Sequence, residues 1–329
     1  MLLMTLVIIT LALLFDFVNG MNDAANSIAT IVSTKVLTPR FAVLWAAFFN
    51  FVAAFGFGVH VANTIGKGIV EIAVVDEYLV LSALIGAIIW TYLCTHVGLP
   101  ISVSHALIGG LAGAAITKAG LDSLIVSGLL KVALFVFLSP LLGLILGYIF
   151  MTGILWIFKN TTPYRADQIF RIGQLFSSAV FSLGHGTNDA QKTMGIIALT
   201  LFSAGYLGDT FYVPFWVVLS AHFCIALGTY LGGWRVVRTM GMRLTHLKPI
   251  GGFCAESSGA IVLLGTALSG IPVSTTHTIA GAIMGVGATR RLSAVRWGIA
   301  GQIVWAWVLT IPASGLVSSM VFGLISLFH

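Results

Sequence analysis

The chain has 329 residues, of which 58% are hydrophobic and only 8% are charged, and its formal net charge is +6. Soluble globular domains carry about 25% charged residues, so this composition excludes a soluble protein and predicts an integral membrane protein. The basic residues are scattered over short loops and form no basic stripe, which argues against nucleic-acid binding. The short loops also leave no room for a soluble catalytic domain.

Apolar stretches follow one another along the chain, and each reaches the roughly 20 residues that a helix needs to cross the hydrocarbon core. None alternates polar and apolar residues in units of about 10, as a membrane β-barrel requires. We therefore expect an all-α polytopic membrane protein. The stretches are residues 1–34, 41–65, 78–117, 124–158, 169–202, 212–233, 255–288 and 297–328.

A polar motif interrupts the first stretch, where residues 19–26 read Asn-Gly-Met-Asn-Asp-Ala-Ala-Asn. An ionised Asp at the centre of a membrane helix costs about 2.5–3.5 kcal/mol on insertion scales, so Asp23 predicts a functional role. Its carboxylate would repel an anion unless a hard cation such as Na⁺ neutralised it. Asn22 and Asn26 supply neutral oxygen ligands for such a cation.

Residues 98–104 contain Gly, Pro and hydroxyl groups but no charge, unlike the charged aqueous loops of this chain. This favours a re-entrant hairpin whose tip stops within the membrane over two ordinary spans. Pro100 breaks the incoming helix, and Ser102 and Ser104 open the outgoing helix as N-caps. The unpaired N–H groups, hydroxyls and helix dipole of such a tip suit an anion. His105 either contacts that anion or is a satisfied structural histidine.

The stretch 124–158 would be about 52 Å long as a helix, which fits one long helix better than two helices and a turn. Both motifs then recur. Residues 185–192 match the first motif at a spacing of 166, and residues 270–281 match the first tip at a spacing of 172. Each half thus holds a broken motif helix, a spanning helix, a re-entrant hairpin and a long spanning helix.

Three crossings per half is an odd number, so we expect two inverted-topology repeats, residues 1–160 and 161–329, in one membrane domain. Lys67 and Lys118 then face one side of the membrane. By the positive-inside rule the other, basic side is cytoplasmic, which leaves both termini outside. We expect the protein to lie in the cell (inner) membrane. The basic side holds Lys35, Arg40, Lys159, Arg165, Arg171, Arg235, Arg238, Arg243, Lys248, Arg290, Arg291 and Arg296.

The second motif departs from the first, because Lys192 stands where the repeat has Asn26. Lys192 either pairs with Asp189 or contacts the anion, so the two halves are not expected to bind a cation identically. Matched glycines four residues apart beyond each tip, Gly109 with Gly113 and their repeat equivalents Gly281 with Gly285, are expected to pack helices together.

Single polar residues stand outside the two motif pairs. Glu256, whose repeat equivalent is Leu84, is a candidate ligand for a proton or a cation. Asp16 lies seven residues before Asp23, and its equivalent is Ser182. Asn50 corresponds to His222, and this pair either lines the pathway or joins helices.

The paired motifs, the first completed as NDxxN, resemble the signature of the inorganic phosphate transporter family, whose members symport phosphate with sodium or protons. The resemblance covers essentially the whole chain. It implies a phosphate site between the two tips, cation sites near the Asn/Asp motifs, an inverted-repeat fold and a homodimer surrounded by membrane lipid. No cofactor is implied beyond the transported phosphate and its co-transported Na⁺ or H⁺.

We therefore predict a cation-coupled phosphate symporter that works by alternating access. A symporter of sulfate or of a metal–phosphate complex is the alternative, and an ion channel is a weaker one. An enzyme is not expected, because no nucleophile is fixed beside a base. Candidate phosphate-binding residues are Ser102, Val103, Ser104, His105, Lys192, Ser274, Thr275, Thr276 and His277. Candidate cation-binding or coupling residues are Asn22, Asp23, Asn26, Asn188, Asp189 and Glu256, all but the last as Na⁺ ligands.

Overall fold

A computed structural model describes residues 2–56 and 58–328, without the side chain of Lys67, one of the two lysines predicted for the non-cytoplasmic side. Every regular element in those ranges is helical, which confirms the predicted all-α fold. The α-helices are α1 (Leu2–Ser33), α2 (Pro39–Val52), α3 (His60–Lys67), α4 (Glu77–Val97), α5 (Val103–Ala119), α6 (Val126–Ile157), α7 (Pro163–Ser203), α8 (Phe215–Leu231), α9 (Trp234–Arg238), α10 (Pro249–Leu268), α11 (Thr275–Ala288) and α12 (Trp297–Ser326).

Five of these helices, α1, α4, α6, α10 and α12, are long and apolar enough to cross a membrane. Two bent pairs, one of them α8 with α9 at 64°, raise the number to seven. The predicted single helix over 124–158 is confirmed as the 32-residue α6. The predicted break in each motif helix is wrong, because α1 and α7 continue as helices through residues 19–26 and 185–192. Most of α6 and α12 is exposed and apolar, as helices that face lipid require.

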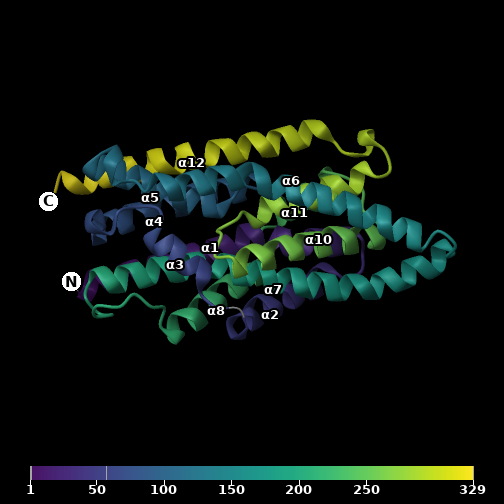
Figure 1. Cartoon of the computed structure of the whole chain (residues 1–329), viewed down its shortest axis with the longest axis horizontal. Coiled ribbons are helices and arrows are strands. Elements are labelled where there is room, and N and C mark those ends of the chain that lie inside the picture. Colours follow the sequence, from purple (N-terminus) through teal and green to yellow (C-terminus); the bar gives the residue numbers. More distant parts are fainter. Residues whose placement is uncertain (1, 57, 329) are drawn as a thin grey trace.

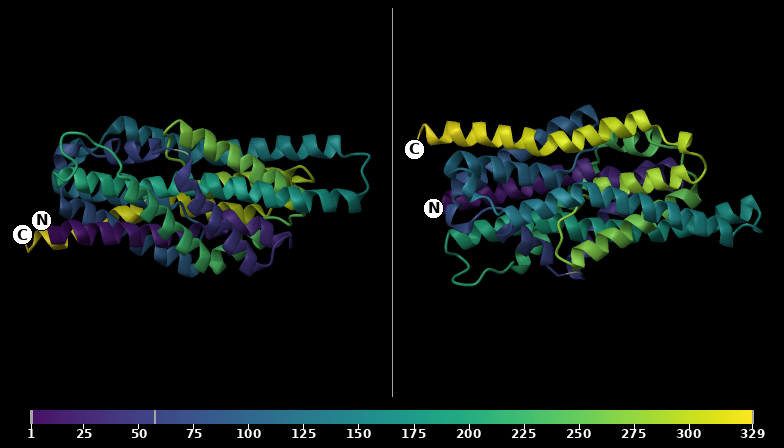
Figure 2. Two further views of the ribbon diagram at one scale, coloured as in Figure 1. Left: turned by 90° about the horizontal axis from the view of Figure 1, so that it is seen from below. Right: turned by 45° about the horizontal axis from the view of Figure 1, so that its top comes forward.

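The long helices that begin and end the two halves run in opposite directions (Figure 1). Helix α1 leads away from the end of the molecule where the chain begins, and α7 leads back toward it. The long helices α6 and α12 are opposed in the same way, so α12 ends near the start of α1 (Figure 2). This is the arrangement that inverted repeats would produce.

Each hairpin turns at a glycine in the left-handed region and restarts at a capping serine. Gly98 after α4 has φ 80°, and Gly270 after α10 has φ 67°. The hydroxyls of Ser102 and Ser274 then accept hydrogen bonds from the backbone N–H three residues later, at 3.3 and 3.2 Å. The predicted capping role of Ser102 is thus confirmed, whereas Ser104 was wrongly predicted as a cap, because it lies in the first turn of α5.

The second arm of each hairpin packs against the long helix of the other half. A Cβ atom placed on Gly113 of α5 would lie 2.2 Å from the carbonyl oxygen of Gly315 on α12. On α11, a Cβ atom on Gly281 would lie 2.1 Å from the carbonyl oxygen of Pro140 on α6. The predicted role of the glycine pairs in helix packing is therefore confirmed.

Hydrogen bonds reinforce the contact between α5 and α12. The Ser318 and Ser319 hydroxyls donate to the carbonyl oxygens of Gly110 and Gly113, at 2.7 and 2.9 Å. The indole N–H of Trp307 donates to the carbonyl oxygen of Pro100 at the tip, at 3.1 Å. These bonds fix the first hairpin to the last helix of the chain.

Basic residues from separate parts of the chain line shared pockets. Lys35, Arg171, Lys248 and Arg290 line one pocket. Arg235, Arg238 and Arg243 line another. The structure thus brings together basic residues that were predicted to share one side of the membrane.

The glycine contact between α11 and α6 gives a stability prediction. Gly281→Ala should lower the melting temperature of the purified protein, because overpacking against the Pro140 carbonyl costs about 1–3 kcal/mol. Gly153→Ala on α6 is the control, since no atom lies within 4 Å of an added Cβ there and Ala is the better helix former. Thermal unfolding in detergent measures both variants, and equal melting temperatures would contradict the contact.

Candidate functional site

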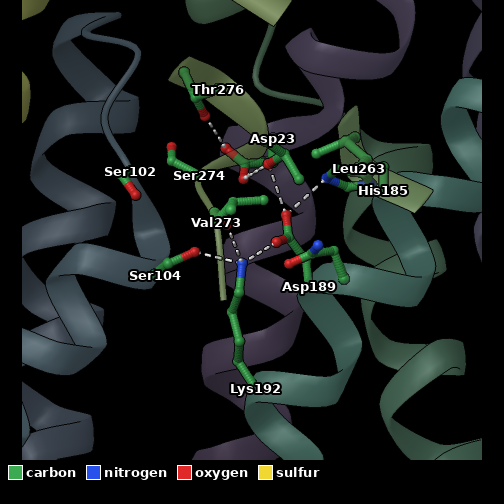
Figure 3. A network of polar contacts seen from close by, with 12 residues as sticks. Asp23, Ser102, Ser104, His185, Asp189, Lys192, Leu263, Val273, Ser274 and Thr276 are labelled. Atoms are coloured by element: carbon green, nitrogen blue, oxygen red, sulfur yellow. Dashed lines mark hydrogen bonds and ion pairs between the residues drawn. The ribbon is translucent and has the colours of Figure 1, made fainter. Parts of the chain in front are cut away.

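The second hairpin tip meets both acidic motifs (Figure 3). The Thr276 hydroxyl donates to Asp23 Oδ1 at 3.1 Å. The neighbouring Thr275 hydroxyl lies 2.9 Å from Asp189 Oδ2 and 3.2 Å from Asp23 Oδ2. All four side chains are buried. The first turn of α11 therefore joins the carboxyl groups of α1 and α7.

Lys192 connects the second motif to both tips. Its Nζ donates to Asp189 Oδ1 and to the Ser104 hydroxyl of the first tip helix. It also donates to the carbonyl oxygen of Val273 in the second tip, at 3.1 Å. Only 1% of Lys192 is exposed. Of its two predicted roles, pairing with Asp189 is the one that the structure contains (Figure 3).

His185 belongs to the site, although the sequence motifs predicted no role for it. Its Nε2 lies 3.1 Å from Asp189 Oδ2, one helical turn away on α7. Its Nδ1 lies 3.0 Å from Asn50 Oδ1 on α2, and the Asn50 amide donates to Thr229 of α8 at 3.0 Å. Asn50 therefore joins helices, one of its two predicted roles. The spacing of four residues between His185 and Asp189 was the available signal.

The three predicted asparagine ligands share one arrangement. Each amide nitrogen donates to a threonine hydroxyl: Asn22 to Thr95 at 2.8 Å, Asn26 to Thr276 at 2.9 Å and Asn188 to Thr266 at 3.5 Å. Each Oδ1 atom is buried and has no hydrogen-bond partner among the described residues. Carbonyl oxygens are ligands for hard cations, so these three atoms suit the predicted role.

The central site holds two carboxyl groups and one ammonium group. Ligand atoms of Asp23, His185 and Asp189 all lie within 4.8 Å of one another. When both carboxyl groups are ionised, Lys192 balances one of them and leaves the other uncompensated. Two like charges about 4 Å apart repel by about 4 kcal/mol at an effective dielectric constant of about 20. One bound monovalent cation would bring the formal charge of this group to zero.

The structure places Glu256 in a separate cluster. Its carboxylate accepts hydrogen bonds from Thr30 at 2.6 Å, Gln174 at 2.9 Å and Ser177 at 2.5 Å. These residues lie on α1 and α7, so Glu256 of α10 joins the two motif helices. Its hydrogen-bond partners within the ranges that the structure describes do not include Asp23 or Asp189, and its predicted ligand role requires a second site.

The two tip histidines face each other. The ring centroids of His105 and His277 are 4.9 Å apart, and His277 stacks on Trp307 at 3.8 Å. His277 Nδ1 lies 3.3 Å from the carbonyl oxygen of Val136. The rings thus have structural neighbours, and their contact with phosphate stays a prediction. Val103, the first residue of α5, is buried at the first tip.

Comparisons with known proteins agree on one family. A model described as "Phosphate transporter family" matches residues 19–318. A probable low-affinity inorganic phosphate transporter of Rhizobium meliloti is 56% identical, over 96% of this chain and 94% of the relative. A protein of the same description from Bacillus subtilis is 39% identical, over 99% and 98%. A solved structure described as "The sodium-dependent phosphate transporter" has a TM-score of 0.89 at 28% identity and covers 99% of this chain and 100% of its own.

The buried ion pair of Lys192 and Asp189 gives a second prediction. Lys192→Met should destabilise the protein by about 3–5 kcal/mol, because it leaves the Asp189 carboxylate buried without its partner. Adding Asp189→Asn should restore much of that loss. Lys118→Met is the control, since the pair of Lys118 with Asp76 is partly exposed and is worth at most about 1 kcal/mol. Thermal unfolding measures the unchanged protein, both central single variants, their double variant and the control, and additive effects of the two central substitutions would exclude the coupling.

Proposed function

This chain belongs to the phosphate transporter family, and on that premise we propose that it carries inorganic phosphate through the membrane together with Na⁺ or H⁺ by alternating access. The observation that carries the proposal is the meeting of two anion-suited hairpin tips with two acidic motifs around a single lysine. The similar solved structure is that of a sodium-dependent phosphate transporter, which supports Na⁺ as the coupling ion.

Phosphate would bind between the two tips. Lys192 supplies the positive charge, and Ser104, Thr275 and Thr276 supply hydroxyl donors. The first turns of α5 and α11 add backbone N–H groups and the positive ends of two helix dipoles. The capping hydroxyls of Ser102 and Ser274 hold these turns in place.

The cation would bind before the anion. The uncompensated carboxylate of the Asp23–Asp189 pair repels phosphate, and a Na⁺ ion beside the free Oδ1 atoms of Asn22, Asn26 and Asn188 removes that repulsion. Binding of the cation thus raises the affinity for phosphate, and linkage requires that phosphate raises the affinity for the cation equally. This reciprocity is the physical basis of coupling.

Alternating access would move packed units as bodies. The glycine contacts and hydrogen bonds between α5 and α12 make these helices one unit, and the glycine contacts between α11 and α6 make another. Rocking of these units against α1 and α7 would open the tips first to one side and then to the other. The opposed directions of the two halves support inverted repeats (Figure 1).

The orientation and assembly follow from the same reasoning. The basic pocket beside the α6–α7 connection would face the cytoplasm, which would leave both ends of the chain outside. The exposed apolar faces of α6 and α12 would contact lipid or a second copy, and the family resemblance favours a homodimer in the cell membrane.

Gradient-driven uptake in liposomes tests the central proposal. The purified protein should accumulate labelled phosphate when a Na⁺ or H⁺ gradient is imposed. Asp23→Asn and Asp189→Asn should each lower the initial rate more than about tenfold, which corresponds to about 1.4 kcal/mol, because each removes cation-binding charge. Asp122→Asn, in an exposed loop, is the matched control.

Full uptake by both central variants would refute the mechanism. Imposing Na⁺ and pH gradients separately identifies the coupling ion. Excess unlabelled sulfate should compete weakly, whereas strong competition would favour a general oxyanion transporter. Flux that ignores every imposed gradient would favour a channel.

Glu256 should act on coupling and not on phosphate binding. Its carboxylate is held by three donors away from the tips, so Glu256→Gln should preserve binding of labelled phosphate at saturating Na⁺ within about threefold, less than about 0.7 kcal/mol. Uptake and its cation dependence should fall much further. Glu71→Gln, at an exposed position, is the control. Parallel losses of binding, uptake and melting temperature would assign Glu256 a purely structural role.

A further inference from the structure

Asp16 is a buried carboxylate that the central site does not use. It lies on α1 with 0% of its surface exposed. Neither Oδ1 nor Oδ2 has a hydrogen-bond partner among the residues that the structure describes. Asp23, Asp189 and Glu256, in contrast, all accept hydrogen bonds from hydroxyl groups. An ionised carboxylate without close donors at membrane depth is costly, so a bound cation would stabilise it.

Unpaired oxygen atoms surround this carboxyl group. The side chains of Asn19 on α1 and Thr193 on α7 face it. Asn19 Oδ1 and Thr193 Oγ1 are buried and also lack a hydrogen-bond partner in the described ranges. Cys224 of α8 lies close by. Three neighbouring side chains from two helices therefore carry four buried oxygen atoms without a close hydrogen-bond partner. Two of these atoms belong to the Asp16 carboxyl group.

Other charges leave room for a positive ion here. Asp189 and Lys192 are the charged groups near enough to interact with Asp16. Lys192 already donates to Asp189, Ser104 and Val273 and does not contact the Asp16 carboxylate. A negative charge on Asp16 would thus not be balanced by a bonded cationic side chain.

The second half of the chain lacks the acid. At the repeat spacing of 166, the equivalents of Asp16 and Thr193 are Ser182 and Ser27. Both of these hydroxyl groups are buried and unpaired in the described part of the chain. The repeat thus keeps buried polar side chains at both positions, but only Asp16, in the middle of α1, has an acidic group.

We propose that Asp16, Asn19 and Thr193 form an additional site for a monovalent hard cation, Na⁺, next to the Asp23–Asp189 centre. Carboxylate, amide and hydroxyl oxygens are the ligands that such a cation takes. Seven residues, about 10 Å along α1, separate Asp16 from Asp23 on the same face of the helix. The role of this site in coupling rests on the proposed cation symport, but its existence does not.

Direct binding of Na⁺ tests the site without transport. Purified protein is titrated with ²²Na⁺ in the absence of phosphate, with choline replacing Na⁺ to hold ionic strength. Asp16→Asn should reduce the number of Na⁺ ions bound per chain by one. Thr193→Val, which keeps the charge and removes one ligand, should lower the affinity for that Na⁺ ion by about tenfold, or about 1.4 kcal/mol. The control variant Ser182→Ala, at the equivalent position of the other half, should bind the same number of Na⁺ ions with the same affinity as the unchanged protein.

The outcomes separate this proposal from the proposed function. Loss of one ion in Asp16→Asn supports the site even if liposomes show no gradient-driven phosphate uptake. Unchanged stoichiometry and affinity in both Asp16→Asn and Thr193→Val would overturn it. Unchanged Na⁺ binding with an altered pH dependence of uptake would also overturn it, because Asp16 would then bind a proton. Equal melting temperatures of the variants verify that folding is intact.

Discussion

The position of one buried ammonium group organises this molecule. Lys192 Nζ donates to Asp189 on its own helix, to Ser104 in the first tip and to the Val273 carbonyl in the second. Both tips are irregular backbone that the membrane tolerates only inside protein, so they require a polar partner at this depth. The two acidic motifs in turn require positive charge and donors, which Lys192 and the first turn of α11 supply. The tips and the acidic motifs thus supply each other's hydrogen-bond and charge partners.

Three polar positions on α1 share one face of that helix because they are seven residues, or about two turns, apart. Asp16 faces Thr193, Asp23 accepts from Thr276, and Thr30 donates to Glu256. Buried carboxyl groups therefore follow one another along α1 from its first half to its last turns. A cation that moved along this face would pass from one carboxylate to the next and would not meet a long apolar barrier.

Local patterns predicted the parts of this site, whereas the contacts between them were not predictable. The uncharged Gly-Pro-Ser tip and the Asp within an apolar stretch are each unusual enough to be recognised from the local sequence. The single helix α6 was predicted from the length of the apolar stretch 124–158. Helix α5 packs against α12, and His185 contacts Asn50. Both contacts are between segments that lie far apart in the chain. Spacing within a helix carries no information on such pairings. Ser102 caps α5 and Ser104 does not, because the helix begins at Val103. The sequence pattern did not determine that starting residue.

In the proposed mechanism, the difference between Asn26 and Lys192 would allow one cation to bring the central charge to zero. These residues are repeat equivalents, and each contacts the tip of the opposite half: Asn26 donates to Thr276, and Lys192 donates to its equivalent, Ser104. The geometry is thus repeated, but the charge is not. Two asparagines would leave both carboxylates uncompensated, and phosphate would be repelled strongly. Two lysines would neutralise both carboxylates, and phosphate would then bind without a cation, so that no coupling would result. In the proposed mechanism, a single lysine leaves one negative charge at the centre, and that charge would make the binding of phosphate depend on a cation.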